Sequence, residues 1–200
     1  MKNIIEIGVN TGTDTDMLLK KYPDANYYGF EPTRELLAQA LWPRFGEPRV
    51  HMLPFAVHSE NTFMEFHVAG QGDWGCSSLY KFDPNIHEKW PGRPDFKESH
   101  SYKVPCIRMD TFLETWNVQG DIEYAWIDAQ GNDLVALQSF GKHIERLKAG
   151  KLECALNIEL YTGTINTFEN VQKFLTDNGY MYSMTPDPTS AECNVDFWRE

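Results

Sequence analysis

The stretch that decides the fold is NIIEIGVNTG at residues 3–12, where a short apolar run ends in a turn that contains glycine. The apolar run predicts a buried β-strand, and Thr13 or Asp14 follows as the cap of a helix that Pro23 ends. Glycines at a strand-to-helix turn let the backbone pass close to a ligand. This turn therefore predicts a nucleotide-type binding loop. Its candidate cofactor-binding residues are Glu6, Gly8, Asn10, Thr11 and Gly12.

This loop departs from the G-x-G-x-x-G pattern of dinucleotide-binding proteins. Asn10 stands where that pattern has its second glycine, and Thr13 stands where it has its third. The acidic Glu6 before the loop suits a cationic ligand group better than a diphosphate. A nicotinamide-dependent oxidoreductase is therefore the less favoured enzyme class. The alternative to a binding loop is a tight turn between strand and helix that binds no ligand.

The rest of the chain alternates short apolar runs with amphipathic stretches, a pattern typical of a parallel sheet flanked by helices. We see no repeat and no domain boundary, so we predict one α/β domain over residues 1–200. The predicted strands are 3–8, 26–31, 50–57, 62–68, 102–109, 124–128, 154–160, 180–184 and 193–198. The predicted helices begin near residues 13, 33, 110 and 167, and a further one carries Leu134, Val135 and Leu137.

Glu31 closes the second predicted strand, and Pro32 fixes the direction in which the chain leaves it. An acidic side chain at this place can accept hydrogen bonds from both hydroxyls of a ribose. The alternative is a residue that caps the next helix or faces solvent. Together with the glycine loop, the position favours ribose binding.

Residues 70–101 are irregular and rich in glycine, proline and aromatic residues. A loop of this length in a compact domain is usually functional, so we expect a segment that covers a site and contacts substrate. Trp74, Trp90 and Phe96 either stack on a ligand ring or form a small core of the loop itself. His87 is the titratable side chain in this segment that we consider for catalysis.

Composition excludes several classes of partner. The chain has 18 basic and 29 acidic residues, a net charge of −11, and no basic run, so we expect neither a nucleic acid nor a membrane partner. With 42% hydrophobic residues it can bury a full core. The spacing of its four cysteines matches no metal site and its N-terminus lacks a signal peptide, so we expect reduced thiols and a cytoplasmic location.

Six short motifs in order resemble the FkbM-like family of class I S-adenosylmethionine-dependent methyltransferases, over nearly the whole chain. They are the acidic-x-Gly-x-Asn-x-Gly loop at 6–12, Phe-Glu-Pro at 30–32, Ala-Val at 56–57, Ser-Ser-Leu at 77–79, Met-Asp at 109–110 and WIDAQG at 126–131. The last two stand where the family has Leu-Asp and Lys-Ile-Asp-Val-Glu-Gly. Trp126 therefore replaces the usual lysine, and the customary extension before the first strand is missing.

The resemblance implies a Rossmann-like, mostly parallel seven-stranded sheet in the order 3-2-1-4-5-7-6, with S-adenosylmethionine at its carboxyl edge. In that order the strands ending at Gly8 and Asp128 face each other across the methyl donor, and Glu159 ends the next strand. The cofactor-binding residues that it adds are Glu31, Pro32, Ala56, Val57 and Asp128. The substrate-binding residues that we expect are Trp74, Ser77, Ser78 and Gln130.

The turn after the strand that ends at Asp128 reads Asp-Ala-Gln-Gly, whereas methyltransferases of planar amides and amines carry (Asp/Asn)-Pro-Pro-aromatic there. We therefore predict methylation of a hydroxyl on a small molecule or glycan. A hydroxyl is a poor nucleophile while it keeps its proton, so a base is needed, and the candidates are Asp128, Glu159, Asp133 and His87.

Two alternatives to this reaction scheme stay open at this point. Asp128 and Glu159 would instead hold a Mg²⁺ ion, which two carboxylates alone do not favour. A module that binds S-adenosylmethionine without turnover is the non-enzymatic alternative.

Overall fold

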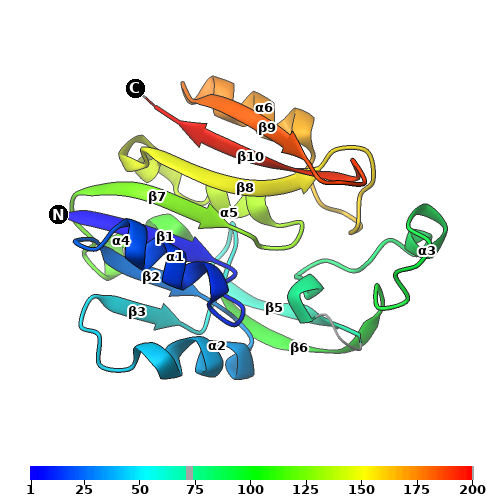
Figure 1. Ribbon diagram of the computed structural model, residues 1–200, viewed down its shortest axis with the longest axis horizontal. Coiled ribbons are helices and arrows are strands. Elements are labelled where there is room, and N and C mark those ends of the chain that lie inside the picture. Colours follow the sequence, from blue (N-terminus) through cyan, green and yellow to red (C-terminus); the bar gives the residue numbers. More distant parts are fainter. Residues whose placement is uncertain (71–73, 200) are drawn as a thin grey trace.

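The computed structural model describes residues 1–70 and 74–199 and shows a seven-stranded sheet (Figure 1). Parallel strands are β1 (Lys2–Ile7), β2 (Asn26–Phe30), β3 (Val50–Leu53), β7 (Asp121–Ile127) and β8 (Ala149–Ala155). The C-terminal strands β9 (Met181–Pro186) and β10 (Glu192–Trp198) pair antiparallel, β10 with β8 and β9 with β10.

The strands of this sheet follow the order β3-β2-β1-β7-β8-β10-β9. These labels differ from the predicted 3-2-1-4-5-7-6 because three strands of a second sheet come between β3 and β7 along the chain. Numbered among themselves, the seven strands read 3-2-1-4-5-7-6. The order reverses between β1 and β7, which is where an open α/β sheet binds its ligand.

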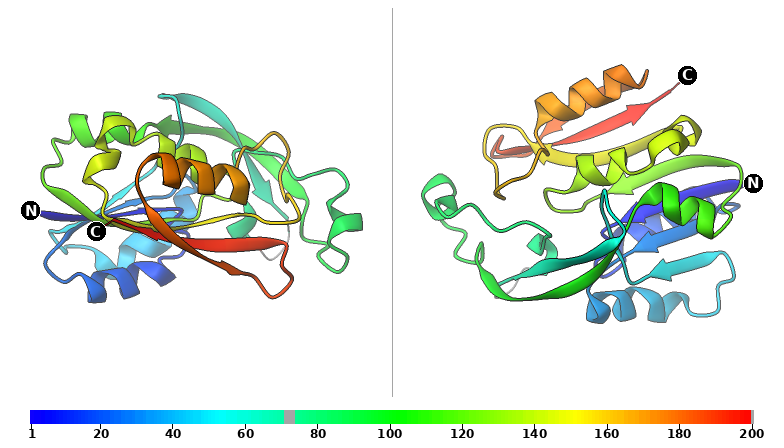
Figure 2. Two further views of the ribbon diagram at one scale, coloured as in Figure 1. Left: turned by 90° about the horizontal axis from the view of Figure 1, so that it is seen from above. Right: turned by 180° about the vertical axis from the view of Figure 1, so that it is seen from behind.

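Helices cover the sheet unequally (Figure 2). On one face α1 (Thr13–Lys21) buries Leu18 against Ile4, Tyr27 and Val50. The other face is covered by α4 (Met109–Thr115), α5 (Asp133–Gln138) and α6 (Phe168–Asp177), which bury Phe112, Leu134, Val171 and other apolar residues in the main core. The remaining helices are α2 (Arg34–Leu41), α3 (Ile86–Lys89) and the short 3₁₀ turns 42–44, 74–76 and 141–146.

The second sheet has the order β4-β6-β5 and was not predicted. Pro54 and Phe55 divide the predicted strand 50–57, so that β4 (Ala56–Val57) leaves the main sheet and pairs with β6 (Glu98–Ile107). β5 (Thr62–Ala69) pairs antiparallel with β6. The segment predicted to be a loop over 70–101 is therefore the tip of a long hairpin, and its end already belongs to β6. Residues 71–73 of that segment lie outside the described residues.

The tip of this hairpin has a small core of its own. Ile86 and Phe96 pack against Leu160 and Tyr161, with Phe82 and Trp90 at the edge of the cluster. Asp83 N donates to Leu160 O at 2.9 Å. Trp90 and Phe96 thus pack within the loop's own core. The segment is tied to the chain that follows β8, and movement over a ligand stays a prediction.

The predicted strand at 154–160 is wrong by about five residues, because β8 begins at Ala149 and ends at Ala155. Glu159 lies four residues beyond that end and is exposed. Ile158 and Leu160 are apolar because they pack in the hairpin cluster, which accounts for the strand-like pattern.

The four cysteines are free thiols, and Cys154 and Cys193 face each other across β8 and β10 with their sulfurs 3.5 Å apart. Over residues 1–70 and 74–199, no helix is both long and apolar enough to cross a membrane.

Candidate functional site

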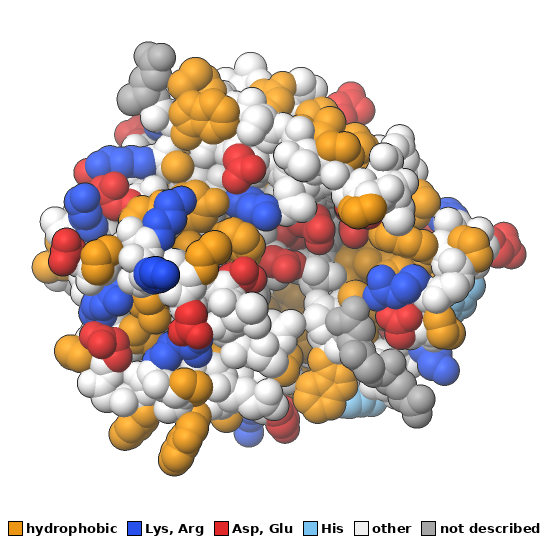
Figure 3. Space-filling model, viewed as in Figure 1, with side chains coloured by type: hydrophobic (Ala, Val, Ile, Leu, Met, Phe, Trp, Pro, Cys, Tyr) orange, Lys and Arg blue, Asp and Glu red, His pale blue; other side chains and the backbone are white. Residues whose placement is uncertain are grey.

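A hollow opens at the carboxyl ends of β1, β2 and β7, and Figure 3 shows its mouth near the centre of the molecule with acidic side chains along one edge. The space not filled by protein atoms measures about 590 Å³ when the open solvent at its mouth is included. The predicted residues that line it are Gly8, Asn10, Glu31, Pro32, Ala56, Val57, Trp74, Ser77, Asp128 and Gln130.

The glycine loop forms one side of the hollow. Gly8 has φ +85°, and a Cβ there would lie 1.8 Å from the carbonyl oxygen of Asp128. Asn10 also has a positive φ, of 51°. Only a residue without a side chain lets β1 and β7 approach this closely at their ends. Of the other loop residues, Thr11 is exposed, Gly12 is buried against the Arg44 side chain, and neither lines the hollow.

Glu31 faces the hollow from the end of β2 and is 5% exposed. One of its carboxylate oxygens accepts a hydrogen bond from Asn10 N at 2.9 Å, and the other accepts one from Thr33 N at 2.8 Å. Burial raises the pKa of Glu31, and the two backbone hydrogen bonds work in the opposite direction. These bonds fix the carboxylate while each oxygen keeps a lone pair for a ligand.

Glu6 lies under the loop, 1% exposed, and does not line the hollow. Its carboxylate accepts hydrogen bonds from the hydroxyls of Thr15, at 2.8 Å, and Tyr27. It therefore joins β1, α1 and β2, and the predicted direct role in binding is replaced by a structural one. Burial raises the pKa of Glu6 to about 7, although both hydrogen bonds lower it.

Glu6 should make stability depend on pH. Its pKa is about 7 in the folded chain against 4.5 for the free group, so the folded state holds the extra proton between these values. Its contribution is complete below pH 4.5 and is lost as the pH rises through 7. We expect Glu6→Gln to remove on the order of 1 to 3 kcal/mol of this pH dependence. Urea unfolding of both proteins at pH 5 and pH 8 measures this difference. If the unfolding free energy changes equally between the two pH values in the wild type and in Glu6→Gln, the assignment to Glu6 is contradicted.

Asp128 directly follows β7 and is joined to the hairpin through two further side chains. Gln130 Nε2 donates to Asp128 Oδ1 at 2.6 Å, and Gln130 Oε1 accepts from Tyr161 OH at 2.8 Å. Tyr161 OH also lies 2.8 Å from Cys76 O. Gln130 has a φ of +51°, a left-handed conformation that a side chain adopts at some cost. The chain of contacts holds the Asp128 carboxylate at the rim of the hollow.

The hairpin contributes Trp74, Gly75, Ser77 and Leu79 to the wall of the hollow. Trp74 is 46% exposed. Ser78 does not line the hollow: it is buried, and its hydroxyl donates to Gln130 O at 2.6 Å. Its predicted contact with substrate is thus replaced by a contact that seats the hairpin on the turn after β7.

Three of the four candidate bases lie away from the hollow. Asp133 is 1% exposed within α5 and accepts from Ala129 N at 3.2 Å, and burial followed by the charge of Asp128 raises its pKa well above the usual range. Glu159 is exposed beyond β8, and His87 is exposed on α3. Asp128 is the candidate that lines the hollow.

Sequence reasoning missed two half-buried acids beside Asp128. Glu153 stands near the end of β8, and burial together with the charge of Asp128 raises its pKa. Glu192 begins β10, and burial and the charge of Glu153 raise its pKa. Because the strand predicted at 154–160 was shifted by about five residues, the sequence did not place these two acids beside Asp128. Among the described residues, no group of three or more His, Cys, Asp or Glu is arranged to hold a metal ion.

A match between this sequence and a family of known proteins identifies the family of the chain. Residues 6–182 match the family described as the methyltransferase FkbM domain. The chain belongs to this methyltransferase family. The match begins at Glu6, near the end of β1, and ends within β9, so it includes the glycine loop and the whole of β2 and β7. None of the curated proteins matches the chain.

Solved methyltransferases share the fold at low sequence identity. Fibrillarin from Aeropyrum pernix, in complex with natively bound S-adenosyl-L-methionine, aligns at TM-score 0.53 and 10% identity, covering 98% of this chain and 65% of that one. Precorrin-6y C5,15-methyltransferase from Geobacter metallireducens GS-15 aligns at 0.50 and 12% identity, covering 99% and 80%. The METTL16 MTase domain aligns at 0.52 and 8% identity, covering 100% and 59%. This FkbM-family chain thus has the class I methyltransferase fold and spans about two thirds of the fibrillarin chain.

Proposed function

We propose that this protein binds S-adenosylmethionine in the hollow and transfers its methyl group to a hydroxyl oxygen of a small molecule or glycan. The observation that carries the proposal is the fixed carboxylate of Glu31 at the end of β2, beside the left-handed glycine loop of a methyltransferase-family chain. Membership of that family favours methyl transfer over the nicotinamide-dependent alternative.

The residues present fit this donor. Glu31 offers carboxylate oxygens to the two ribose hydroxyls. Pro32, Phe55 and Leu79 give the hollow apolar walls suited to a purine ring. When bound, the donor supplies an electrophilic methyl group, which an attacking oxygen takes while the carbon–sulfur electron pair stays on sulfur.

The chain's own contribution is alignment and one proton transfer. Holding two reactants in line lowers the activation barrier by roughly 7 to 11 kcal/mol. A positioned base raises the rate by a further factor of roughly 10² to 10⁴. We propose Asp128 as the base that accepts the hydroxyl proton, with Gln130 as the residue that positions its carboxylate. The substrate lies against Trp74 and Ser77 of the hairpin in this proposal.

Two features support a hydroxyl acceptor outside nucleic acid. The turn after β7 carries Ala129 and Gln130 in place of the prolines that serve planar amides and amines. The net charge of −11 would repel a phosphate backbone. Incubation with methyl-labelled S-adenosylmethionine and pools of hydroxylated small molecules or glycans tests the acceptor. If neither pool is labelled and amines or RNA are labelled instead, the proposal of a hydroxyl acceptor is contradicted.

The donor site is tested by Glu31→Ala. Charged hydrogen bonds are worth roughly 1.5 to 3 kcal/mol each, so we expect affinity for S-adenosylmethionine to fall by at least about 10-fold. Calorimetric titration measures this, with the melting temperature recorded to exclude unfolding. The matched control is Glu35→Ala, an exposed glutamate of α2 outside the hollow, which should bind normally. Unchanged affinity in Glu31→Ala would remove Glu31 from the site.

A further inference from the structure

A groove adjoins the hollow between the start of α2 and β6, which lie next to each other in Figures 1 and 2. We call it the α2–β6 groove. Three residues, Pro32, Thr33 and Trp74, line both the groove and the hollow. The two spaces are therefore continuous at these residues, and a ligand that is too long for the hollow extends into the groove.

Aromatic and apolar side chains form part of the wall of the α2–β6 groove. His100 and Tyr102 stack with their ring centroids 6.0 Å apart, and Trp74 is 46% exposed where groove and hollow meet. Val68 and Val104 are buried and give the groove an apolar lining. Exposed aromatic rings beside an apolar surface suit a sugar, whose C–H groups pack on a ring while its hydroxyls stay in water.

The charge of the α2–β6 groove differs in sign from that of the whole chain. Besides His100, the described residues with ionisable groups of high charge in its wall are two cations, Arg34 and Lys103, and one acid, Glu35. They leave one net positive charge, whereas the chain carries −11. One carboxylate balances this charge. A phosphate monoester brings about −1.5 to −2 at pH 7 and is matched less well.

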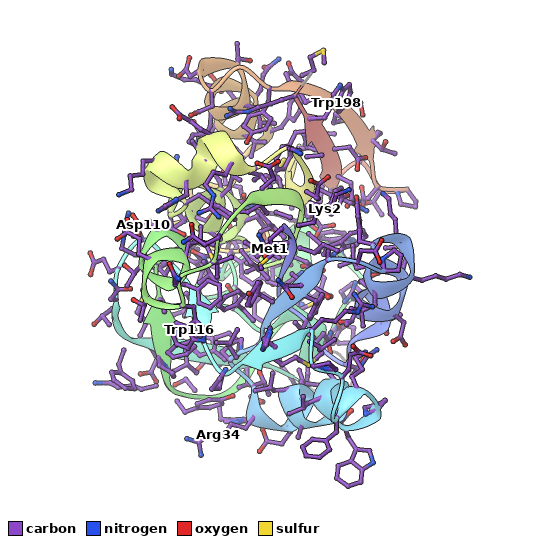
Figure 4. All side chains as sticks on the ribbon, turned by 90° about the vertical axis from the view of Figure 1, so that its left-hand side faces the viewer. Met1, Lys2, Arg34, Asp110, Trp116 and Trp198 are labelled. Carbon is purple, nitrogen blue, oxygen red and sulfur yellow. The ribbon has the colours of Figure 1, made fainter. Side chains whose placement is uncertain are left out.

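The guanidinium of Arg34 is available for such an anion. In the described part of the chain its side chain takes part in no ion pair and no hydrogen bond, and Figure 4 shows it projecting from the edge of the molecule. Arg44 and Arg108, by contrast, are each paired with an aspartate. Burial raises the pKa of Tyr102, whereas the charge of Arg34 lowers it, so this charge acts on the groove.

We propose that the α2–β6 groove binds the part of the acceptor beyond its reacting hydroxyl, and that the acceptor is a glycan with a carboxylate group held by Arg34. The inference rests on the proposed function, because it assumes that the hydroxyl is methylated in the hollow. A guanidinium pairs with a carboxylate through two parallel hydrogen bonds, which Lys103 reinforces by its charge. The sugar ring lies against Trp74 and Tyr102 and connects the hollow to the groove.

The test compares two pools of acceptors that differ in one chemical group. The first is a mixture of oligosaccharides rich in uronic acids, and the second is the same mixture after its carboxyl groups have been reduced to alcohols. Each is incubated with the wild-type protein and methyl-labelled S-adenosylmethionine. We expect the initial rate on the acidic pool to exceed the rate on the reduced pool by at least about 5-fold, the effect of a charged hydrogen bond at a partly exposed site.

Two neighbouring variants should change this rate ratio in opposite directions. Arg34→Gln removes the cation that holds the carboxylate and should lower the ratio below about 2-fold. Glu35→Gln removes the neighbouring negative charge and should raise the ratio by roughly 2-fold. Both side chains are exposed at the start of α2, and a general loss of stability would not produce opposite changes in a ratio.

Lys20→Gln is the matched control. Lys20 is an exposed cation in the last turn of α1 and lines neither the hollow nor the groove. Its variant changes the net charge of the chain by the same amount as Arg34→Gln. The ratio between the acidic and the reduced pool should therefore stay at the wild-type value.

The outcomes separate this inference from the proposed function. If neither pool is labelled, the proposed glycan acceptor is wrong and the inference falls with it. If both pools are labelled equally, or if Arg34→Gln keeps the wild-type ratio, hydroxyl methylation stands and the role of the α2–β6 groove is overturned. A third pool, of sugar phosphates, tests the kind of anion: faster labelling there than in the acidic pool would overturn the carboxylate. A ratio that falls in Arg34→Gln, rises in Glu35→Gln and is unchanged in Lys20→Gln supports the inference.

Discussion

Asp128→Asn should lower turnover by about 10² or more while changing donor affinity by less than about 3-fold. The variant keeps an Oδ1 that can accept from Gln130 Nε2, so the geometry of the rim is preserved. It loses the negative charge that accepts the proton of the attacking hydroxyl. Single-turnover rates with labelled donor, together with calorimetric donor titrations, separate the two effects.

Glu159→Gln is the matched control for this experiment. Glu159 is exposed beyond the end of β8, so its variant should keep full activity. Activity lost in Glu159→Gln and kept in Asp128→Asn would contradict the placement of the base. Loss of donor affinity in Asp128→Asn equal to the loss of turnover would assign Asp128 to donor binding instead of proton transfer.

Gly8→Ala should destabilise the fold by about 3 kcal/mol or more and remove measurable donor binding. Its new Cβ would lie 1.8 Å from Asp128 O, so β1 and β7 would have to move apart at the point where they form the hollow. The φ of +85° adds the strain of a left-handed alanine. Urea unfolding and donor titration measure the two losses.

Gly46→Ala separates backbone strain from steric conflict. Gly46 has a nearly equal φ of +89°, but no atom lies within 4 Å of the position of its Cβ. We expect it to lose only roughly 1 to 2 kcal/mol and to bind the donor normally. Equal destabilisation in both variants would show that the close approach of Asp128 contributes nothing.

The parts of the site that the sequence predicts are those determined by local chemistry. Gly8 follows a buried run and permits a positive φ, Glu31 directly follows β2, and Asp128 directly follows β7. Each is recognisable within about ten residues of sequence. Because parallel strands place their carboxyl ends at one edge, these three predicted positions meet in one hollow.

Other predictions were wrong where contacts between distant segments determine whether an apolar or a charged side chain stands at a position. The apolar residues Ile158 and Leu160 give the pattern of a strand, which predicts Glu159 at a strand end. In the structure both residues are apolar because they pack against the hairpin. In β8, Lys151 and Glu153 interrupt the apolar pattern, and Lys151 lies over the ring of Trp126 at 4.5 Å. A charged residue that packs on an aromatic ring cannot be told from a solvent-facing one by periodicity.

Asn132 illustrates what no local pattern contains. The residue directly precedes α5, where an asparagine ordinarily caps the helix through its side chain. Its Nδ2 donates instead to Val57 O, 75 positions away in the chain, and Leu134 N of α5 donates to Asn166 Oδ1, 32 positions further on. Both contacts follow only from three segments meeting in space.

The central claim is that the hollow holds S-adenosylmethionine, and native mass spectrometry tests it most directly. The protein is measured as purified and after incubation with S-adenosylmethionine or with a nicotinamide dinucleotide, in wild-type and Glu31→Ala forms. We predict one adenosylmethionine or adenosylhomocysteine per wild-type chain, weaker occupancy in Glu31→Ala, and no retained dinucleotide. A wild-type chain that retains the dinucleotide, or that stays empty with excess adenosylmethionine, would contradict the account.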